Sequence, residues 1–209
     1  MKNLARGSLP SILAALAISS VLSAQADSLD YDYIELSTVD TKYFENGVDL
    51  SGYNLDVSWQ LGNHFSLLLG FDNVNGDTES TDFFRDERLK TKHFGFGFRS
   101  EVAEDLDFVI EYSKDDYQVR IVEIEPGTVI SYPVDEDGDT TKIGLRGQFT
   151  ASLQWDLYGV RMTLDDADVD DSGFQAAVRY AIVDDLSVGL SVARVGDFEQ
   201  TALSFRYNY

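Results

Sequence analysis

Apolar and polar residues alternate with a period of two along much of the chain. The stretch 201–209 shows this most clearly, because Leu203, Phe205 and Tyr207 fall on one face while Arg206 falls on the other. Strict alternation predicts a β-strand with one apolar and one polar face. An aromatic edge strand of this kind would invite aggregation in a soluble protein. A strand that closes a barrel in lipid needs such an outer row, so the pattern favours a membrane barrel.

Ten segments with this alternation follow residue 30 and predict ten strands, or eight if the first or ninth segment is not a strand. The connections between them alternate in length. Short turns at one rim and longer loops at the other are typical of outer-membrane barrels, whose long loops face out of the cell. The short turns are predicted at 61–64, 100–105, 149–152 and 183–185, and the longer, acidic loops at 39–49, 75–88, 115–139 and 165–173, with a brief last loop at 195–200.

A soluble sandwich or barrel is the alternative fold for an alternating chain, with its apolar face turned inward. Here the minor face carries charged residues such as Glu111 and Arg179 at strand centres, while Phe, Leu, Tyr and Val dominate the major face. Burying so many charges in a soluble core would be costly. We therefore predict an all-β fold, a transmembrane antiparallel up-and-down β-barrel in the outer membrane of a Gram-negative bacterium.

The N-terminus reads as a cleavable secretory signal. Lys2 and Arg6 precede an apolar stretch at 9–22, and the small-x-small sequence at 24–26 is the predicted cleavage site. An uncleaved anchor helix is the weaker alternative, because the apolar stretch is short. The predicted domains are the signal peptide, 1–26, and the outer-membrane barrel, 27–209.

Composition narrows the possible partners. The chain has 37 Asp and Glu against 16 Lys and Arg, a formal net charge of −21, so nucleic acid is not expected as a partner. It has no cysteine, so disulfides and thiolate metal sites are excluded. No long apolar run follows the signal peptide, which excludes a spanning helix in the mature chain.

Charged residues on the minor face predict a salt-bridged band across the lower lumen. Arg146 is expected between Asp107 and Asp156, and Arg206 is expected beside Glu35 where the barrel closes. Such a band would replace a hydrophobic core as a polar plug. The less favoured interpretation is a charge filter for a narrow solute path. The predicted lumen network is Glu35, Asp56, Arg99, Asp107, Glu111, Arg146, Asp156, Arg179 and Arg206.

Aromatic residues near the short turns predict an interfacial girdle, where amphipathic rings prefer the headgroup region. Its predicted members are Trp59, Phe65, Phe98, Phe149, Trp155, Tyr180, Tyr207 and Tyr209.

No cofactor, metal site or catalytic residue is predicted. The acidic segments 135–139 and 165–171 do not fit a calcium-loop template, although loose divalent bridging to lipopolysaccharide is a weak hypothesis. Catalysis would need a base near a nucleophile. His93, with Ser66 or Thr91, is the one combination worth weighing, and no motif supports it. We therefore expect that the protein is not an enzyme.

The signal peptide, the alternating hairpins and the aromatic last strand resemble small outer-membrane barrels of the OmpA/OmpX type. The opening Leu29-x-Tyr31-x-Tyr33-x-Glu35 is similar to small exported barrels of gamma-proteobacteria. The resemblance implies that the terminal aromatic residue is read by the barrel-assembly machinery, although Tyr209 replaces the usual Phe. A monomer in contact with outer-membrane lipid and lipopolysaccharide is expected. Its expected role is structural or surface-interactive; the alternative is a narrow passive channel for small solutes or ions.

Overall fold

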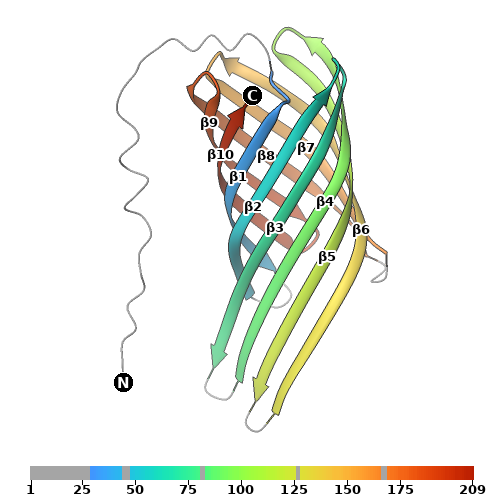
Figure 1. Ribbon diagram of the computed structural model, residues 1–209, viewed down its shortest axis with the longest axis vertical. Coiled ribbons are helices and arrows are strands. Elements are labelled where there is room, and N and C mark those ends of the chain that lie inside the picture. Colours follow the sequence, from blue (N-terminus) through green and yellow to red (C-terminus); the bar gives the residue numbers. More distant parts are fainter. Residues whose placement is uncertain (1–28, 44–47, 81–82, 126–127, 166–168) are drawn as a thin grey trace.

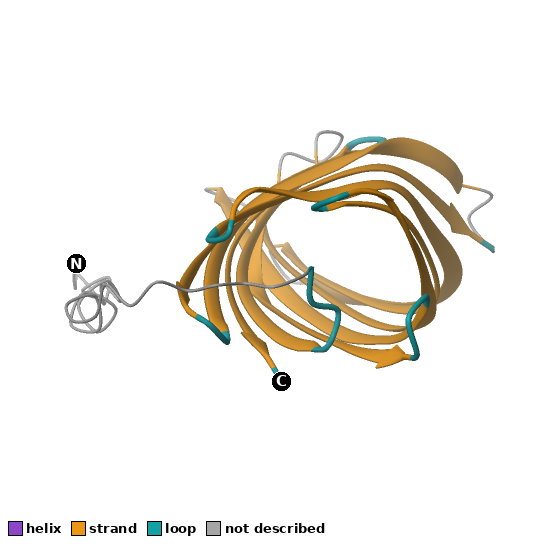
Figure 2. Ribbon diagram, turned by 90° about the horizontal axis from the view of Figure 1, so that it is seen from above, coloured by secondary structure: helices purple, strands orange, loops and turns teal. Residues whose placement is uncertain are grey.

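The computed structural model describes residues 29–43, 48–80, 83–125, 128–165 and 169–209. They form ten strands of one closed barrel, in which every strand is antiparallel to its neighbours and β1 pairs with β10 (Figure 1, Figure 2). The prediction of ten strands is confirmed, and the alternative of eight is wrong. The strands are β1 (Tyr33–Tyr43), β2 (Val48–Leu61), β3 (Phe65–Ser80), β4 (Phe83–Ala103), β5 (Leu106–Glu125), β6 (Thr128–Thr150), β7 (Leu153–Leu164), β8 (Val169–Val183), β9 (Leu186–Val195) and β10 (Phe198–Asn208).

The outer surface of the barrel carries a broad apolar belt. Phe96, Leu157 and Leu190 are each more than half exposed, and they lie on three different strands, β4, β7 and β9. Asp156 and Tyr158, on either side of Leu157, are buried inside the barrel. Because lipid accepts apolar side chains and a fully hydrogen-bonded backbone, this surface is that of a membrane-spanning barrel. The described residues contain no helix that could cross a membrane.

The strands from β3 to β6 are much longer than the sequence predicts. The stretches 75–88 and 115–139 are mostly the outer ends of two β-hairpins rather than loops, and these hairpins reach well beyond the other strands in Figure 1. The acidic segment 135–139 therefore lies within β6. Alternation continues through these ends, but the outward residues become polar, so a search for apolar outer faces does not find them. The predicted signal peptide, 1–26, lies outside the described residues.

The seam between β1 and β10 can be tested with cysteine pairs, because the chain has no cysteine of its own. Ser37 lies directly opposite Ser204 across this seam. We expect the Ser37→Cys, Ser204→Cys variant to form a disulfide on oxidation, since paired strand positions match the spacing that the bond requires. Non-reducing gel mobility of the denatured protein measures the cross-link. Ser37→Cys with Ser187→Cys on β9 is the control, and a cross-link in the control alone would contradict the closure.

Candidate functional site

A chain of buried ion pairs runs along the inner wall of the barrel, from β6 to β1, near the end that holds the short turns. Arg146 on β6 donates from Nε to Oδ1 of Asp156 on β7 at 2.9 Å, and Asp156 also pairs with Arg179 on β8. Arg179 donates from Nε to Oε2 of Glu35 on β1 at 3.1 Å. Arg206 on β10 donates to the same oxygen at 2.8 Å. All five side chains are buried, and together they join five strands through the barrel interior.

Strand register supplies two of these contacts directly. Arg146 lies opposite Asp156, and Glu35 lies opposite Arg206 across the closing seam. The Glu35–Arg206 contact is the one that the sequence predicts for a closed barrel of ten strands. The guanidinium of Arg206 also lies over the ring of Tyr33, 3.6 Å from its centroid, in cation–π geometry.

The contact of Arg179 with Glu35 has a different origin, because β8 and β1 are separated by β9 and β10. The residue opposite Arg179 on β9 is Gly189. A side chain at Gly189 would meet Cγ of Arg179 and the hydroxyl of Ser204 on β10. The missing side chain therefore lets Arg179 lean along the wall towards Glu35.

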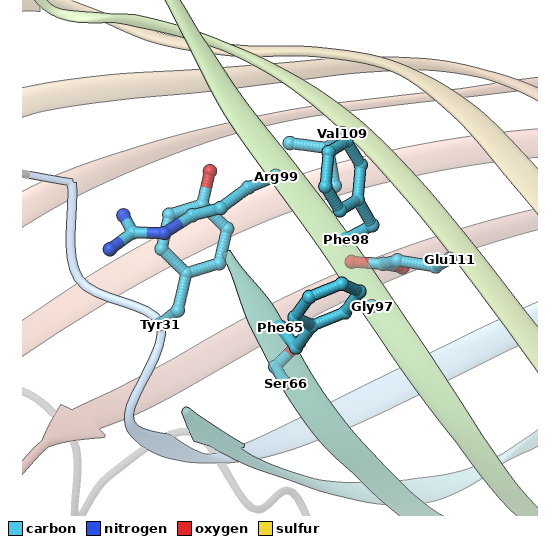
Figure 3. Close-up of a pocket in the computed structure, with 8 residues that line it drawn as sticks. All are labelled: Tyr31, Phe65, Ser66, Gly97, Phe98, Arg99, Val109 and Glu111. Atoms are coloured by element: carbon cyan, nitrogen blue, oxygen red, sulfur yellow. The ribbon is translucent and has the colours of Figure 1, made fainter. Parts of the chain in front are cut away.

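The residues that precede β1 enter the barrel and fill the same end of the lumen. Leu29 and Tyr31 are buried. The guanidinium of Arg99 lies 4.3 Å from the centroid of the Tyr31 ring (Figure 3). That of Arg146 lies 4.4 Å from the same centroid, and the hydroxyl of Tyr31 donates to Oδ2 of Asp107 at 2.9 Å. Arg99 donates from Nη1 to the carbonyl of Leu29 at 3.1 Å. Figure 2 looks along the barrel at this short segment in the mouth.

Sequence reasoning missed this inserted segment, because it assigned Tyr31 to the first strand. The structure begins β1 at Tyr33. A signal was present, since Tyr31 is in phase with Tyr33 and Glu35, which face the lumen. Alternation gives the side to which a residue points, but not whether the backbone still follows the wall.

Seven of the predicted lumen residues belong to this connected group, because Arg99 pairs with Asp107 at 3.5 Å and Tyr31 links that pair to Arg146. The other two form no ion pair with this group in the described part of the chain. Asp56 contacts His93, with 3.0 Å between Oδ1 and Nε2. Glu111 lies opposite Lys142. The connected seven are Glu35, Arg99, Asp107, Arg146, Asp156, Arg179 and Arg206.

The predicted girdle residues that belong to strands sit on the outward row, and Tyr209 directly follows the end of β10. Phe65 and Phe98 contact each other on neighbouring strands with ring centroids 5.5 Å apart, and Phe149 stacks on Trp155 at 5.8 Å. Those at least half exposed are Trp59, Phe65, Phe149, Tyr180, Tyr207 and Tyr209.

The combination of His93 with Ser66 is not formed. His93 lies opposite Gly70, whereas Ser66 lies opposite Gly97, four residues away along the hairpin. A side chain at Gly70 would overlap the imidazole ring, so the glycine makes room for it. Among the described residues there is no group of three or more potential metal ligands.

No protein-family model matches the chain, and no curated protein matches it significantly. Solved structures with a similar fold include Ail, the attachment invasion locus protein of Yersinia pestis, at 11% identity and a TM-score of 0.39, covering 85% of this chain and 94% of Ail. The KdgM porin is 11% identical with a TM-score of 0.46, and the match covers 84% of this chain and 99% of KdgM. Neisserial surface protein A is 6% identical with a TM-score of 0.41, and the match covers 85% of this chain and 95% of that protein. This likeness concerns the fold alone. The closed sheet and its apolar outer belt, rather than these neighbours, identify a membrane-spanning β-barrel.

Replacing Glu35 tests the ion-pair chain. Glu35→Ala leaves the guanidinium groups of Arg179 and Arg206 without their shared carboxylate. We expect the free energy of unfolding to fall by about 3–5 kcal/mol, as for other broken buried ion pairs. Urea unfolding in phospholipid vesicles, followed by tryptophan fluorescence, measures the loss.

Asp170→Ala is the matched control for this variant. Asp170 makes a two-point contact with Arg161, at 2.6 and 2.8 Å, but both side chains are exposed on the outer surface. Exposed pairs contribute little to stability. Equal losses in the two variants would show that the lumen chain is not the stabilising contact.

Proposed function

We propose that the protein is a small outer-membrane barrel with a lumen closed at its periplasmic end and a structural or surface-interacting role. The observation that carries this proposal is the contact of Arg179 with Glu35, because it reaches over two intervening strands, β9 and β10, and so occupies lumen space along that side of the barrel. The inserted segment around Tyr31 adds a second obstruction beside it. Barrels of about this width have interiors that side chains can fill.

A small cavity remains beside the ring of Tyr31. The cavity between Tyr31, Arg99 and Glu111 has a volume of about 10 Å³. That is the lower limit for one water molecule. A solute that passed here would have to displace paired charges from their partners, which leaves a buried charge uncompensated.

The surface role is supported by the long hairpins. In the orientation that places the short turns in the periplasm, β3–β4 and β5–β6 stand out of the cell. Lys92 and Lys114 face outward there and are more than half exposed, each beside an aspartate, Asp116 or Asp139. This mixed row lies where the apolar belt ends, and we propose that it meets the phosphates of lipopolysaccharide in the outer leaflet.

We also propose that the protein is related to barrels of the OmpA/OmpX type and that it is a monomer. The outward Phe205 and Tyr207 of the closing strand support the kinship. We propose that the barrel-assembly machinery recognises this strand. The proposal assigns no catalysis, since His93 engages Asp56 rather than a nucleophile. The second candidate, a narrow channel, is favoured by the open space of about 540 Å³ above the ion-pair chain.

Conductance in planar bilayers separates the two functions. We expect the wild-type protein to show no steady openings, because both obstructions close the lumen. The double variant Tyr31→Ala, Arg179→Ala removes the ring and the crossing side chain, so we expect it to conduct. Tyr180→Ala, on the outward face of the same strand as Arg179, is the control and should stay silent. Steady openings of the wild type would favour the channel instead.

A further inference from the structure

The two faces of the barrel exchange polarity above the apolar belt. Val39, Leu50 and Val74 are buried and form a hydrophobic cluster inside the barrel. On the same strands, Asp40 and Asn75 face outward and are exposed. Outside lipid, an apolar interior and a polar exterior are the arrangement of a soluble barrel. The outer end of this protein is therefore built as a soluble cup on a membrane base.

Apolar side chains line this cup on most of its circumference. Besides the buried cluster, they include Leu89 on β4, Val119 on β5, Met162 on β7, Val195 on β9 and Ala202 on β10. They surround a cavity of about 540 Å³. Ligand pockets of small molecules have volumes of about 300–1,000 Å³ and mostly apolar walls with a few polar groups.

The floor of the cup holds a carboxylate with neutral partners. Asp115 is only 6% exposed, and it accepts hydrogen bonds from Ser113 at 2.8 Å, Thr140 at 2.5 Å and Tyr117 at 3.2 Å. It has no ion pair with a lysine or arginine in the described part of the chain. Hydroxyl groups hold this carboxylate in place but leave its charge to be balanced by something else.

The floor as a whole has an excess of negative charge. Asp56, Asp72 and Glu111 line the cavity with Asp115, and Lys142 is the lysine that faces them. His93 adds at most one further positive charge. The arginines of the ion-pair chain offset only part of the excess, because carboxylates of the lower lumen already engage them. The cup therefore offers a largely apolar wall above a floor that attracts cations. Towards the outer ends of β4 and β6 the wall also carries Arg85, Glu87, Arg88 and Glu136, of which Arg85 and Glu87 form an ion pair.

We propose that this cup binds a small amphipathic cation, with its apolar body against the wall and an ammonium group at the acidic floor. The cluster of Val39, Leu50 and Val74 supplies the apolar contact, and Asp115 and Asp72 supply the charge. This proposal goes beyond the closed-barrel function and does not depend on it, because conductance and ligand binding are measured separately.

Calorimetric titration of the protein in lipid nanodiscs tests the proposal, with octylammonium as the probe. Octanoate, with an alkyl chain of similar length and the opposite charge, is the matched probe, and empty nanodiscs correct for partition into lipid. We expect saturable binding of octylammonium that is on the order of tenfold tighter than that of octanoate. The proposal would be overturned if the heat measured with the protein did not exceed that of empty nanodiscs, or if the two probes bound equally tightly.

Two sets of variants locate the site. Ala202→Trp fills the cup and should abolish binding, whereas Thr201→Trp, on the outward face of the same strand, should leave it unchanged. Asp115→Asn keeps the shape of the floor and should reduce the preference for the cation, with Asp72→Asn as a second charge variant. Heat-dependent gel mobility verifies that each variant is folded. If Thr201→Trp weakens binding as much as Ala202→Trp does, the ligand binds in the lipid and the proposal is wrong.

Discussion

Arg179 and its two carboxylates hold the interior of this barrel together. An arginine side chain pointing into a narrow lumen loses much of its hydration, and that loss is tolerable only when carboxylates replace the water. Glu35 and Asp156 do so from strands on either side, β1 and β7. Closure of the sheet thus brings Glu35 and Asp156 within reach of Arg179, and these ion pairs in turn stabilise the closed barrel.

Lipid and water impose opposite demands on the two ends of the same strands. In the belt, lipid requires apolar residues on the outward row. The charged residues therefore lie on the inward row, where they form ion pairs with one another. Beyond the belt, water accepts outward residues such as Asp40 and Lys92, so Val39 and Leu89 can turn inward. The same strands and the same pairing serve both ends, since only the polarity of the alternation changes.

This change of polarity explains what the sequence could and could not predict. Ten strands and the pairing of Glu35 with Arg206 follow from alternation and closure alone. The outer ends of β3 to β6 could not be predicted in this way, because their outward residues have the composition of a loop. Tyr31 and the Arg179–Glu35 contact depend on how the chain fills a volume, and a one-dimensional pattern does not contain that information.

The closed floor also determines what the cup above it can do. A molecule that enters from the outer rim meets the ion-pair chain before it reaches the periplasm, so entry and exit use the same opening. Transport would require Arg179 and Glu35 to separate in every cycle, which breaks a buried ion pair each time. Capture at the cell surface requires no such rearrangement. The geometry therefore favours binding over passage: the ion-pair chain closes the lumen, and the separate acidic floor above it would select the charge of a bound molecule.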